Sequence, residues 1–236
     1  MCTVTYLPLG GQAFVITSSR DENPGRPTSA RPERQQLGEH TVQFPRDGQA
    51  GGSWIATSER ATLCLLNGAF TAHPSRPPYR HSRGLVILHY FGYAGTDAFI
   101  RGYPTEGLEP FTLVVRDGTG LRELRWDGTA RFARALDPLA PHLWASATLY
   151  GPAALQKRQR WFDAWRAAHP DPDPAAIRRF HRTAGDGDPR NDLHMRREHV
   201  RTVSLTSVLH REGAPPEMWY ERVGEGTERV NYGMIE

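Results

Sequence analysis

The order of strands and helices constrains the fold of this chain more than any other feature of its sequence. Runs of β-forming residues are separated by turns short enough for hairpins, and helical segments come in two groups between them. The predicted strands cover residues 3–7, 13–17, 53–57, 62–66, 111–116, 121–126, 142–146, 200–209 and 218–223, and the predicted helices cover 85–91, 97–103, 152–168 and 173–183. Parallel strands would need alternating strand and helix units, which this order lacks. The sequence therefore predicts antiparallel sheets with helices packed outside them, which is an α+β fold.

Length and composition predict one folded domain over residues 1–236. A chain of 236 residues can bury one large core, and its 38% hydrophobic and 10% aromatic content is typical of a folded protein. Residues 23–52 are rich in Pro, Gly, Arg and Gln, and this composition predicts a long surface loop. The chain has only two cysteines, too few for a disulfide framework, and Cys64 is predicted to be a small buried hydrophobe.

Several classes of function are disfavoured by motifs that the sequence does not contain. No run of about 18 apolar residues and no secretion signal is present, so we expect no membrane insertion and a cytoplasmic location. The net charge of +3 is not gathered into one basic block, so we expect no nucleic-acid partner. The histidines show no His-Glu-x-x-His spacing, and a P-loop, a dinucleotide fingerprint and a Gly-x-Ser-x-Gly elbow are absent. We therefore predict neither a metal site nor a cofactor.

Cys2 is the residue that most strongly suggests chemistry. If the initiator methionine is removed, which a side chain as small as cysteine normally permits, one residue carries both a thiol and a free α-amino group. An α-amino group titrates near pH ~8, so it can take the proton of its own thiol at neutral pH. An adjacent base of this kind activates a weak nucleophile. A cysteine at position 2 is common by chance, and the residues that accompany it decide its meaning.

Two further segments hold polar residues that could serve such a nucleophile. The predicted hairpin of the first two strands brings Arg20 and Asp21 close to Cys2. The guanidinium would favour the thiolate, and the carboxylate would accept hydrogen bonds from the α-amino group. An ordinary surface ion pair is the alternative. The amide of Asn67, at a strand end, suits an oxyanion donor, and a simple Asn-Gly turn with Gly68 is its alternative.

These residues belong to motifs that, taken together, resemble one known family along nearly the whole chain. The sequence is similar to the NRDE family, also called the Transport and Golgi organisation 2 family. In the four-letter motif that names the family, Ser19 stands where asparagine is usual, and Arg20, Asp21 and Glu22 follow it. The matching motifs are Met-Cys-Thr-Val at 1–4, Ser-Arg-Asp-Glu at 19–22, Phe-Pro-Arg-Asp-Gly at 44–48, Gly-Gly-Ser-Trp-Ile-Ala at 51–56, Leu-Asn-Gly at 66–68, Ser-Arg-Gly at 82–84, His-Leu-Trp-Ala-Ser-Ala-Thr-Leu-Tyr at 142–150 and Arg-Thr-Val-Ser-Leu-Thr at 201–206.

The family in turn resembles the N-terminal nucleophile hydrolases of the bile-salt hydrolase and penicillin V acylase type. This resemblance implies a four-layer αββα sandwich of antiparallel sheets. It implies an amidohydrolase that cleaves a linear amide or other acyl bond of a small molecule. Cys2 would be the nucleophile, and Arg20 and Asp21 would be the charged residues beside it. Asn67 would be an oxyanion donor, and Arg201 would be a late arginine of the same site.

Two other functions stay open at the level of sequence. Ala147 occupies the position where the acylases are expected to carry a second oxyanion asparagine, and the loss of one donor slows hydrolysis on the order of 100-fold or more. Members of the family have been linked to haem trafficking and to lipid or acyl-CoA homeostasis. The resemblance therefore also allows a non-catalytic carrier or chaperone of haem or an acyl lipid. An interaction module that kept the fold without the chemistry is the third alternative.

Overall fold

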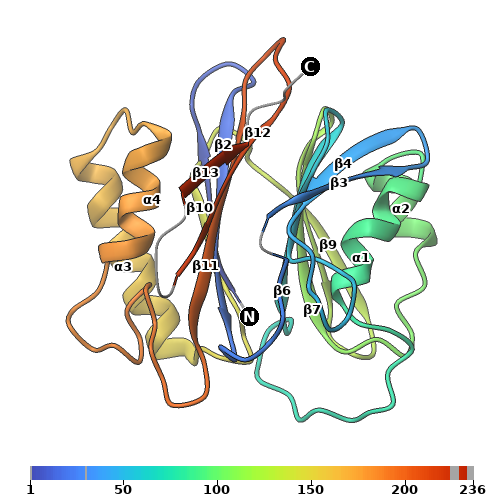
Figure 1. The fold of residues 1–236 in the computed structure, drawn as a ribbon, viewed down its shortest axis with the longest axis horizontal. Coiled ribbons are helices and arrows are strands. Elements are labelled where there is room, and N and C mark those ends of the chain that lie inside the picture. The colour runs from blue at the N-terminus through green and yellow to red at the C-terminus, as the bar shows by residue number, and fades with distance from the viewer. Residues whose placement is uncertain (1, 30, 224–228, 233–236) are drawn as a thin grey trace. The chain divides into compact units, whose positions relative to one another are not determined.

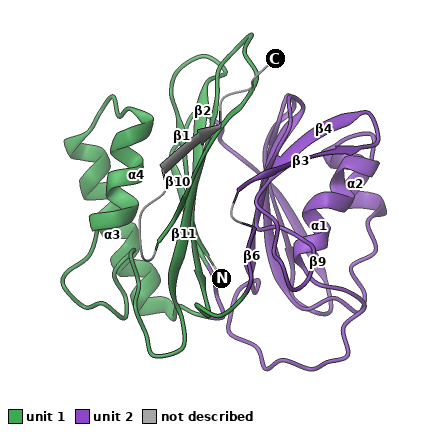
Figure 2. Cartoon of the chain, in the orientation of Figure 1, with its two compact units in different colours: residues 1–26, 139–145, 149–236 green, residues 27–138, 146–148 purple. Residues whose placement is uncertain are grey.

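The computed structural model describes residues 2–29, 31–223 and 229–232 (Figure 1). The chain divides into two compact units (Figure 2). Unit 1 comprises residues 1–26, 139–145 and 149–236, and unit 2 comprises residues 27–138 and 146–148. Each unit combines one antiparallel sheet with its own group of helices. The single domain over residues 1–236 stays a prediction.

Unit 1 is built on a six-stranded antiparallel sheet in the order β10-β1-β2-β11-β12-β13. Its strands are β1 (Cys2–Pro8), β2 (Phe14–Glu22), β10 (His142–Ala145), β11 (Arg201–His210), β12 (Glu217–Arg222) and β13 (Arg229–Tyr232). Strand β1 lies between β10 and β2, so the beginning of the chain is paired on both sides. Helices α3 (Pro152–Ala168) and α4 (Pro174–Thr183) cover one face of this sheet (Figure 1).

Residues that favour helix initiation stand at the start of both helices of unit 1, and apolar side chains pack these helices against the sheet. Each helix has a proline in its first turn, where no backbone N–H is needed. Helix α4 is also capped by Asp173, whose carboxylate accepts a hydrogen bond from the backbone N–H of Ala176 at 2.6 Å. Leu7 of β1 packs with Phe162 of α3 and Phe180 of α4 in one buried core.

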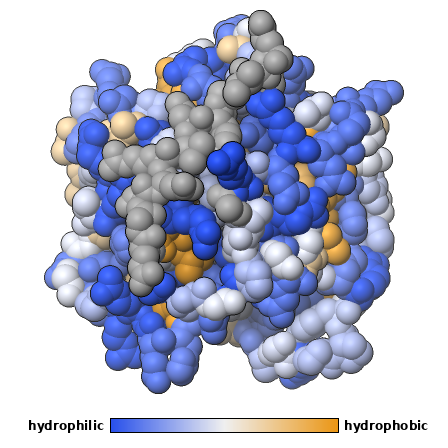
Figure 3. Space-filling view, in the orientation of Figure 1, coloured by the Kyte–Doolittle hydropathy of each residue, from blue (hydrophilic) through white to orange (hydrophobic). Residues whose placement is uncertain are grey.

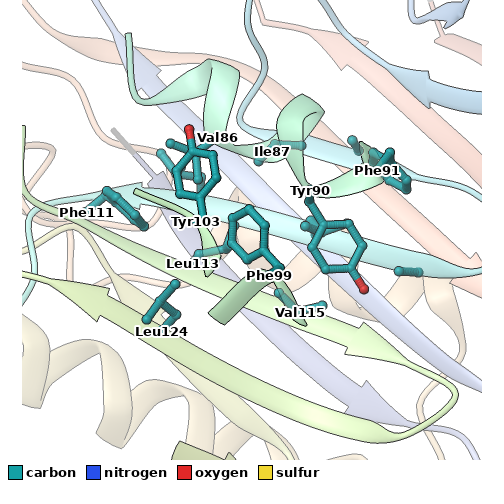
Figure 4. Close-up of a cluster of buried hydrophobic side chains, with 14 of the residues drawn as sticks. Val86, Ile87, Tyr90, Phe91, Phe99, Tyr103, Phe111, Leu113, Val115 and Leu124 are labelled. Atoms are coloured by element: carbon teal, nitrogen blue, oxygen red, sulfur yellow. The ribbon is translucent and has the colours of Figure 1, made fainter. Parts of the chain in front are cut away.

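Unit 2 is built on a seven-stranded antiparallel sheet in the order β3-β4-β5-β6-β7-β8-β9. Its strands are β3 (Glu33–Leu37), β4 (His40–Phe44), β5 (Ile55–Thr57), β6 (Ala61–Asn67), β7 (Phe111–Asp117), β8 (Gly120–Trp126) and β9 (Arg131–Leu136), and its helical elements are α1 (Gly84–His89), the 3-10 turn η1 (Tyr90–Gly92) and α2 (Thr96–Gly102). Aromatic side chains from the helical segment pack against aliphatic side chains in its core (Figure 4). The rings of Phe99 and Tyr103 stack with their centroids 4.6 Å apart, above aliphatic residues of the sheet such as Leu113.

Most elements predicted from the sequence are found within a few residues of their predicted bounds. Helix 152–168 coincides with α3, and the hairpin predicted at 111–126 is formed by β7 and β8. Strand β2 runs on to Glu22, beyond its predicted end, because the polar residues Ser18, Ser19, Arg20 and Asp21 are buried and paired within the sheet. Cys64 is fully buried in β6, as predicted.

The long surface loop predicted over residues 23–52 is wrong, because this segment contains the hairpin of β3 and β4. Strand β3 reads Glu-Arg-Gln-Gln-Leu and is half-exposed or exposed throughout, so no apolar alternation marks it. Gly38, with φ of 60°, occupies the first position of the two-residue turn between Leu37 and His40. Glycine at this position is the local signal for a tight hairpin.

The face drawn in Figure 3 is dominated by hydrophilic side chains, with small separate groups of hydrophobic ones. The large hydrophobic side chains exposed among the described residues are Phe70, Phe132 and Leu139. No helix in the part of the chain that the structure describes has both the length and the apolarity to span a membrane.

Candidate active site

The register of the first two strands brings Cys2 and Arg20 together. The strands β1 and β2 are antiparallel, and Cys2 lies directly opposite Arg20. On the other side of β2, Ser204 of β11 is also opposite Arg20. Directly opposed residues project from the same face of an antiparallel sheet. Cys2, Arg20 and Ser204 therefore share one face, the one opposite to α3 and α4.

The thiol of Cys2 is buried, with 1% of the residue exposed. Burial raises the pKa of this thiol, and the negative charge of Asp21 adds to the rise. The positive charge of Arg20 lowers the pKa, but burial is the larger effect. The thiol therefore stays protonated at neutral pH until a nearby base removes its proton.

Asp21 faces the helices, because successive side chains of a strand point to opposite faces. Its carboxylate is fully buried and accepts two hydrogen bonds. The Tyr150 hydroxyl donates to Oδ2 at 2.6 Å, and the Thr202 hydroxyl donates to Oδ1 at 2.7 Å. Burial raises the pKa of Asp21, while the charge of Arg158 and these two hydrogen bonds lower it. The two adjacent residues predicted to flank the nucleophile thus lie on opposite faces of one strand.

Arg158 is a buried charge in this region that the sequence did not reveal. It lies on α3 and is 0% exposed. Its guanidinium donates to the Thr3 hydroxyl, and to the backbone carbonyl of Asp192 at 2.8 Å. It also stacks on the ring of Tyr150, with Cζ 3.6 Å from the ring centroid. Arg158 therefore connects α3 to the residue that follows the candidate nucleophile.

His181 of α4 is a second buried group that the sequence analysis did not single out. Its Nδ1 is 2.7 Å from the Ser19 hydroxyl, and its Nε2 is 2.8 Å from the Thr5 hydroxyl. Burial, together with the charge of Arg158, lowers the pKa of His181 to about 3, so the ring is neutral at physiological pH. A neutral imidazole donates through one nitrogen and accepts through the other, so it can satisfy both hydroxyls. Ser19, the residue that replaces the usual asparagine, is one of its two partners.

Asn67 belongs to unit 2, where it ends β6. Its backbone carbonyl accepts a hydrogen bond from the Ser146 hydroxyl at 2.7 Å. Gly68 follows with φ of 80°, and a Cβ atom there would lie 2.9 Å from a methyl of Thr148 and 3.2 Å from Cβ of Ala147. Only glycine fits both this backbone conformation and this close packing, so the structure requires Gly68 at the end of β6.

Arg201 lies at the beginning of β11 with an exposed side chain. It is opposite Glu22, beyond the pair formed by Thr202 and Asp21. Its role as a late arginine of the site stays a prediction that follows from the resemblance. No group of three or more His, Cys, Asp or Glu residues is arranged to hold a metal ion within the described ranges.

Comparison with known proteins identifies the family of the chain. A family model described as Transport and Golgi organisation 2 matches residues 1–138, more than half of the chain. The chain belongs to this family. The matched segment of this Transport and Golgi organisation 2 protein includes Cys2, Arg20, Asp21 and Asn67, whereas Arg201 lies outside it. No curated protein matches the sequence.

Solved structures show the fold of this family member. The C2A mutant of conjugated bile acid hydrolase from Clostridium perfringens matches with a TM-score of 0.61 and 7% sequence identity, over 98% of this chain and 92% of that one. A variant of the same enzyme with one arginine replaced by leucine matches with a TM-score of 0.60 and 8% identity, over the same shares of the two chains. The predicted α+β fold of antiparallel sheets with helices outside them is thereby confirmed. At this identity the likeness concerns the fold alone.

Proposed function

We propose that this protein is an N-terminal cysteine hydrolase that cleaves a linear amide or other acyl bond of a small molecule. The observation that carries the proposal is the position of Cys2, at the start of an internal strand and directly opposite Arg20. Support comes from the fold, which is that of a hydrolase of bile acid conjugates. The neighbouring structures include variants of a cysteine and of an arginine, which are the two residue types paired here.

The proposed reaction begins once removal of Met1 makes Cys2 the first residue. Its α-amino group takes the thiol proton, and the thiolate attacks the substrate carbonyl. The tetrahedral oxyanion collapses to a thioester as the ammonium group returns the proton to the leaving nitrogen. Water then attacks the thioester with the amine as base, and the acyl group leaves as a carboxylic acid. The cycle regenerates the thiol and the free amine.

The remaining residues of the proposed site stabilise or orient the charged groups of the reaction. Arg20 stabilises the thiolate from the neighbouring strand. Asp21 accepts hydrogen bonds from the α-amino group and fixes its orientation. The roles of Asn67 as an oxyanion donor and of Arg201 as a further cation rest on the family resemblance, and the position of a second oxyanion asparagine is held by Ala147.

The first test distinguishes the role of the Cys2 thiol from that of its α-amino group. Intact mass spectrometry should show that Met1 is absent, and hydrolysis of a panel of N-acyl amides should be lost in Cys2→Ala. Cys64→Ala is the matched control, because it removes the other, buried thiol and should leave turnover unchanged. Insertion of one alanine between Met1 and Cys2 keeps the thiol and moves the α-amino group to the inserted residue. We expect this insertion variant to lose at least about 100-fold in turnover, since it lacks the internal base.

The proposal fails if Met1 is retained in the active protein, or if Cys2→Ala hydrolyses the same amides at the original rate. The carrier of haem or an acyl lipid remains the second candidate from the family resemblance. The same variants discriminate it: a carrier binds haem or acyl-CoA equally well before and after Cys2→Ala, and no variant of Cys2 changes acyl bonds in the bound molecule.

A further inference from the structure

The carboxylate of Asp21 is buried among neutral donors. Its two oxygen atoms accept from the hydroxyls of Tyr150 and Thr202, at 2.6 and 2.7 Å, and the residue is 0% exposed. Hydrogen bonds from neutral hydroxyls replace only part of the hydration that a carboxylate loses on burial. A nearby positive charge is therefore needed if Asp21 is to remain ionised inside the protein.

Arg158 supplies that charge without touching the carboxylate. Among the described residues it forms no ion pair with Asp21. Its donors are directed instead to the Thr3 hydroxyl and to backbone carbonyls, including that of Asn191 at 3.1 Å. Its guanidinium lies over the ring of Tyr150, with Cζ 3.6 Å from the ring centroid. Such a short distance indicates a desolvated cation–π contact.

Tyr150 connects the cation to the anion. One face of its ring carries the guanidinium, and its hydroxyl donates to Asp21. A cation on the ring draws electron density from the phenol, which makes the hydroxyl a stronger hydrogen-bond donor. Burial raises the pKa of Tyr150 well above its usual value, so the hydroxyl keeps the proton that it donates.

We infer that Arg158 and Tyr150 form a positioning pair that holds Asp21 as a carboxylate beside the amino-terminal end of β1. The inference rests on the proposed function, in which Asp21 orients the α-amino group of Cys2. Arg158 would act twice, because it also binds the hydroxyl of Thr3, the residue after the nucleophile. Neither member of the pair touches the reacting atoms, so both act through Asp21 and Thr3.

Other groups also interact with Asp21, and their effects on its pKa must be distinguished from those of Arg158 and Tyr150. The charge of Asp21 acts on the thiol of Cys2, and the Thr202 hydroxyl of β11 donates a hydrogen bond to the Asp21 carboxylate. His194, which precedes β11, is half-buried, and its pKa is lowered by burial first and by the charge of Arg196 second. His194 is therefore neutral at physiological pH and adds no compensating charge there. Arg197 also lies over the Tyr150 ring, but at 5.4 Å and with its Nη1 donating to the carbonyl of Leu149.

The decisive measurement is the pKa of Asp21 itself, followed by NMR of protein labelled with 13C at the aspartate carboxyl groups. Asp21→Asn assigns the resonance. Arg158→Met replaces the guanidinium by an apolar chain of similar length, and we expect it to raise the pKa of Asp21 by about one unit or more. Arg158→Lys keeps the charge and should restore most of the shift. Tyr150→Phe keeps the ring, removes the hydroxyl and should raise the pKa of Asp21 as well.

Arg197→Gln is the matched control, since it removes the more distant cation from the same ring and should leave Asp21 unshifted. If the full-length Arg158→Met protein does not fold, Tyr150→Phe decides alone. An unchanged pKa of Asp21 in the folded variants overturns the inference. In these variants, all of which keep Cys2, the acid limb of the pH profile of turnover should move to higher pH as the pKa of Asp21 rises. The NMR titration does not depend on turnover, so the two proposals can fail separately. If the pKa of Asp21 shifts as expected but the protein shows no hydrolysis that depends on Cys2, the positioning pair is supported and the proposed function is overturned.

Discussion

At the scale of single residues, the imidazole of His181 links stability to pH. Its pKa is lowered to about 3, by burial first and by the charge of Arg158 second. In the unfolded chain a histidine titrates near pH ~6.5. Between these two values the unfolded state binds one proton that the folded state does not. The stability that depends on a neutral His181 is therefore fully present above pH ~6.5 and is lost as the pH falls toward 3.

The variant His181→Gln removes this titration and should flatten the acid side of the stability curve. Between about pH 6 and about pH 4, the slope of the free energy of unfolding against pH should decrease by about 1.4 kcal/mol per pH unit, the value for one proton. Urea unfolding at several pH values measures the slope. His199→Gln is the control, because that side chain is 80% exposed. An unchanged slope in His181→Gln would contradict the buried neutral imidazole.

The sequence revealed those site residues whose partners are near in the chain. Cys2 and Arg20 are joined by one hairpin, and the turn residues between them are a local signal. Tyr150 and Asp21 are 129 residues apart, and Arg158 and Thr3 are 155 residues apart, so no local pattern pairs them. His181 could have been placed inside, because it follows Phe180 and lies one turn after Ile177 on the apolar face of α4.

At the scale of elements, the amino-terminal cap of α4 determines how firmly His181 is held against the sheet. Asp173 accepts the hydrogen bond of the Ala176 N–H at 2.6 Å. We expect Asp173→Ala to lower the free energy of unfolding by about 1 kcal/mol, because that N–H loses its side-chain acceptor and keeps the backbone carbonyl of residue 173, at 3.0 Å. Asp171→Ala removes a neighbouring exposed carboxylate that lies outside the helix and serves as the control. Equal losses in the two variants, measured by thermal or urea unfolding, would contradict the capping role.

Elements that the sequence predicted are those with an apolar face or a strong turn signal. Helix α3 begins with proline and has one buried aromatic side chain, Phe162, and β7 and β8 flank a tight turn. The missed strand β9 is exposed along almost all its length, so its sequence carries no alternation of buried and exposed positions. Strand β13 was likewise not predicted, and it lies at the edge of its sheet, paired with β12. Edge strands are fixed by pairing with a neighbour, which a single segment does not show.

At the scale of the whole molecule, the order of helices and strands said more about the fold than sequence identity to structures of the same fold did. The fold is shared with structures that are 7–8% identical to this chain. The same order of hairpins and helix pairs was readable from the sequence, because antiparallel connections are short and local. The division of the chain into two compact units could not be predicted from the sequence. Unit 1 is assembled from three separate segments: β1 and β2 come from the first, β10 from the second, and β11, β12 and β13 from the third.

The two units offer a matched pair of core residues that tests whether they open together. Leu7 belongs to the core of unit 1 and Leu113 to the core of unit 2, and both are 0% exposed. Each change to alanine should cost about 2–5 kcal/mol, because it leaves a cavity in a packed core. Every residue of the Leu113 core lies between Val42 and Trp126, within unit 2. We therefore expect Leu113→Ala to speed amide hydrogen exchange mainly in β6, β7 and β8, and Leu7→Ala to speed it mainly in β1, β2 and β11. Mass spectrometry of peptic fragments locates the change. If either substitution accelerated exchange equally in both units, the chain would open as one cooperative domain, which is the single domain over residues 1–236 that the sequence predicts.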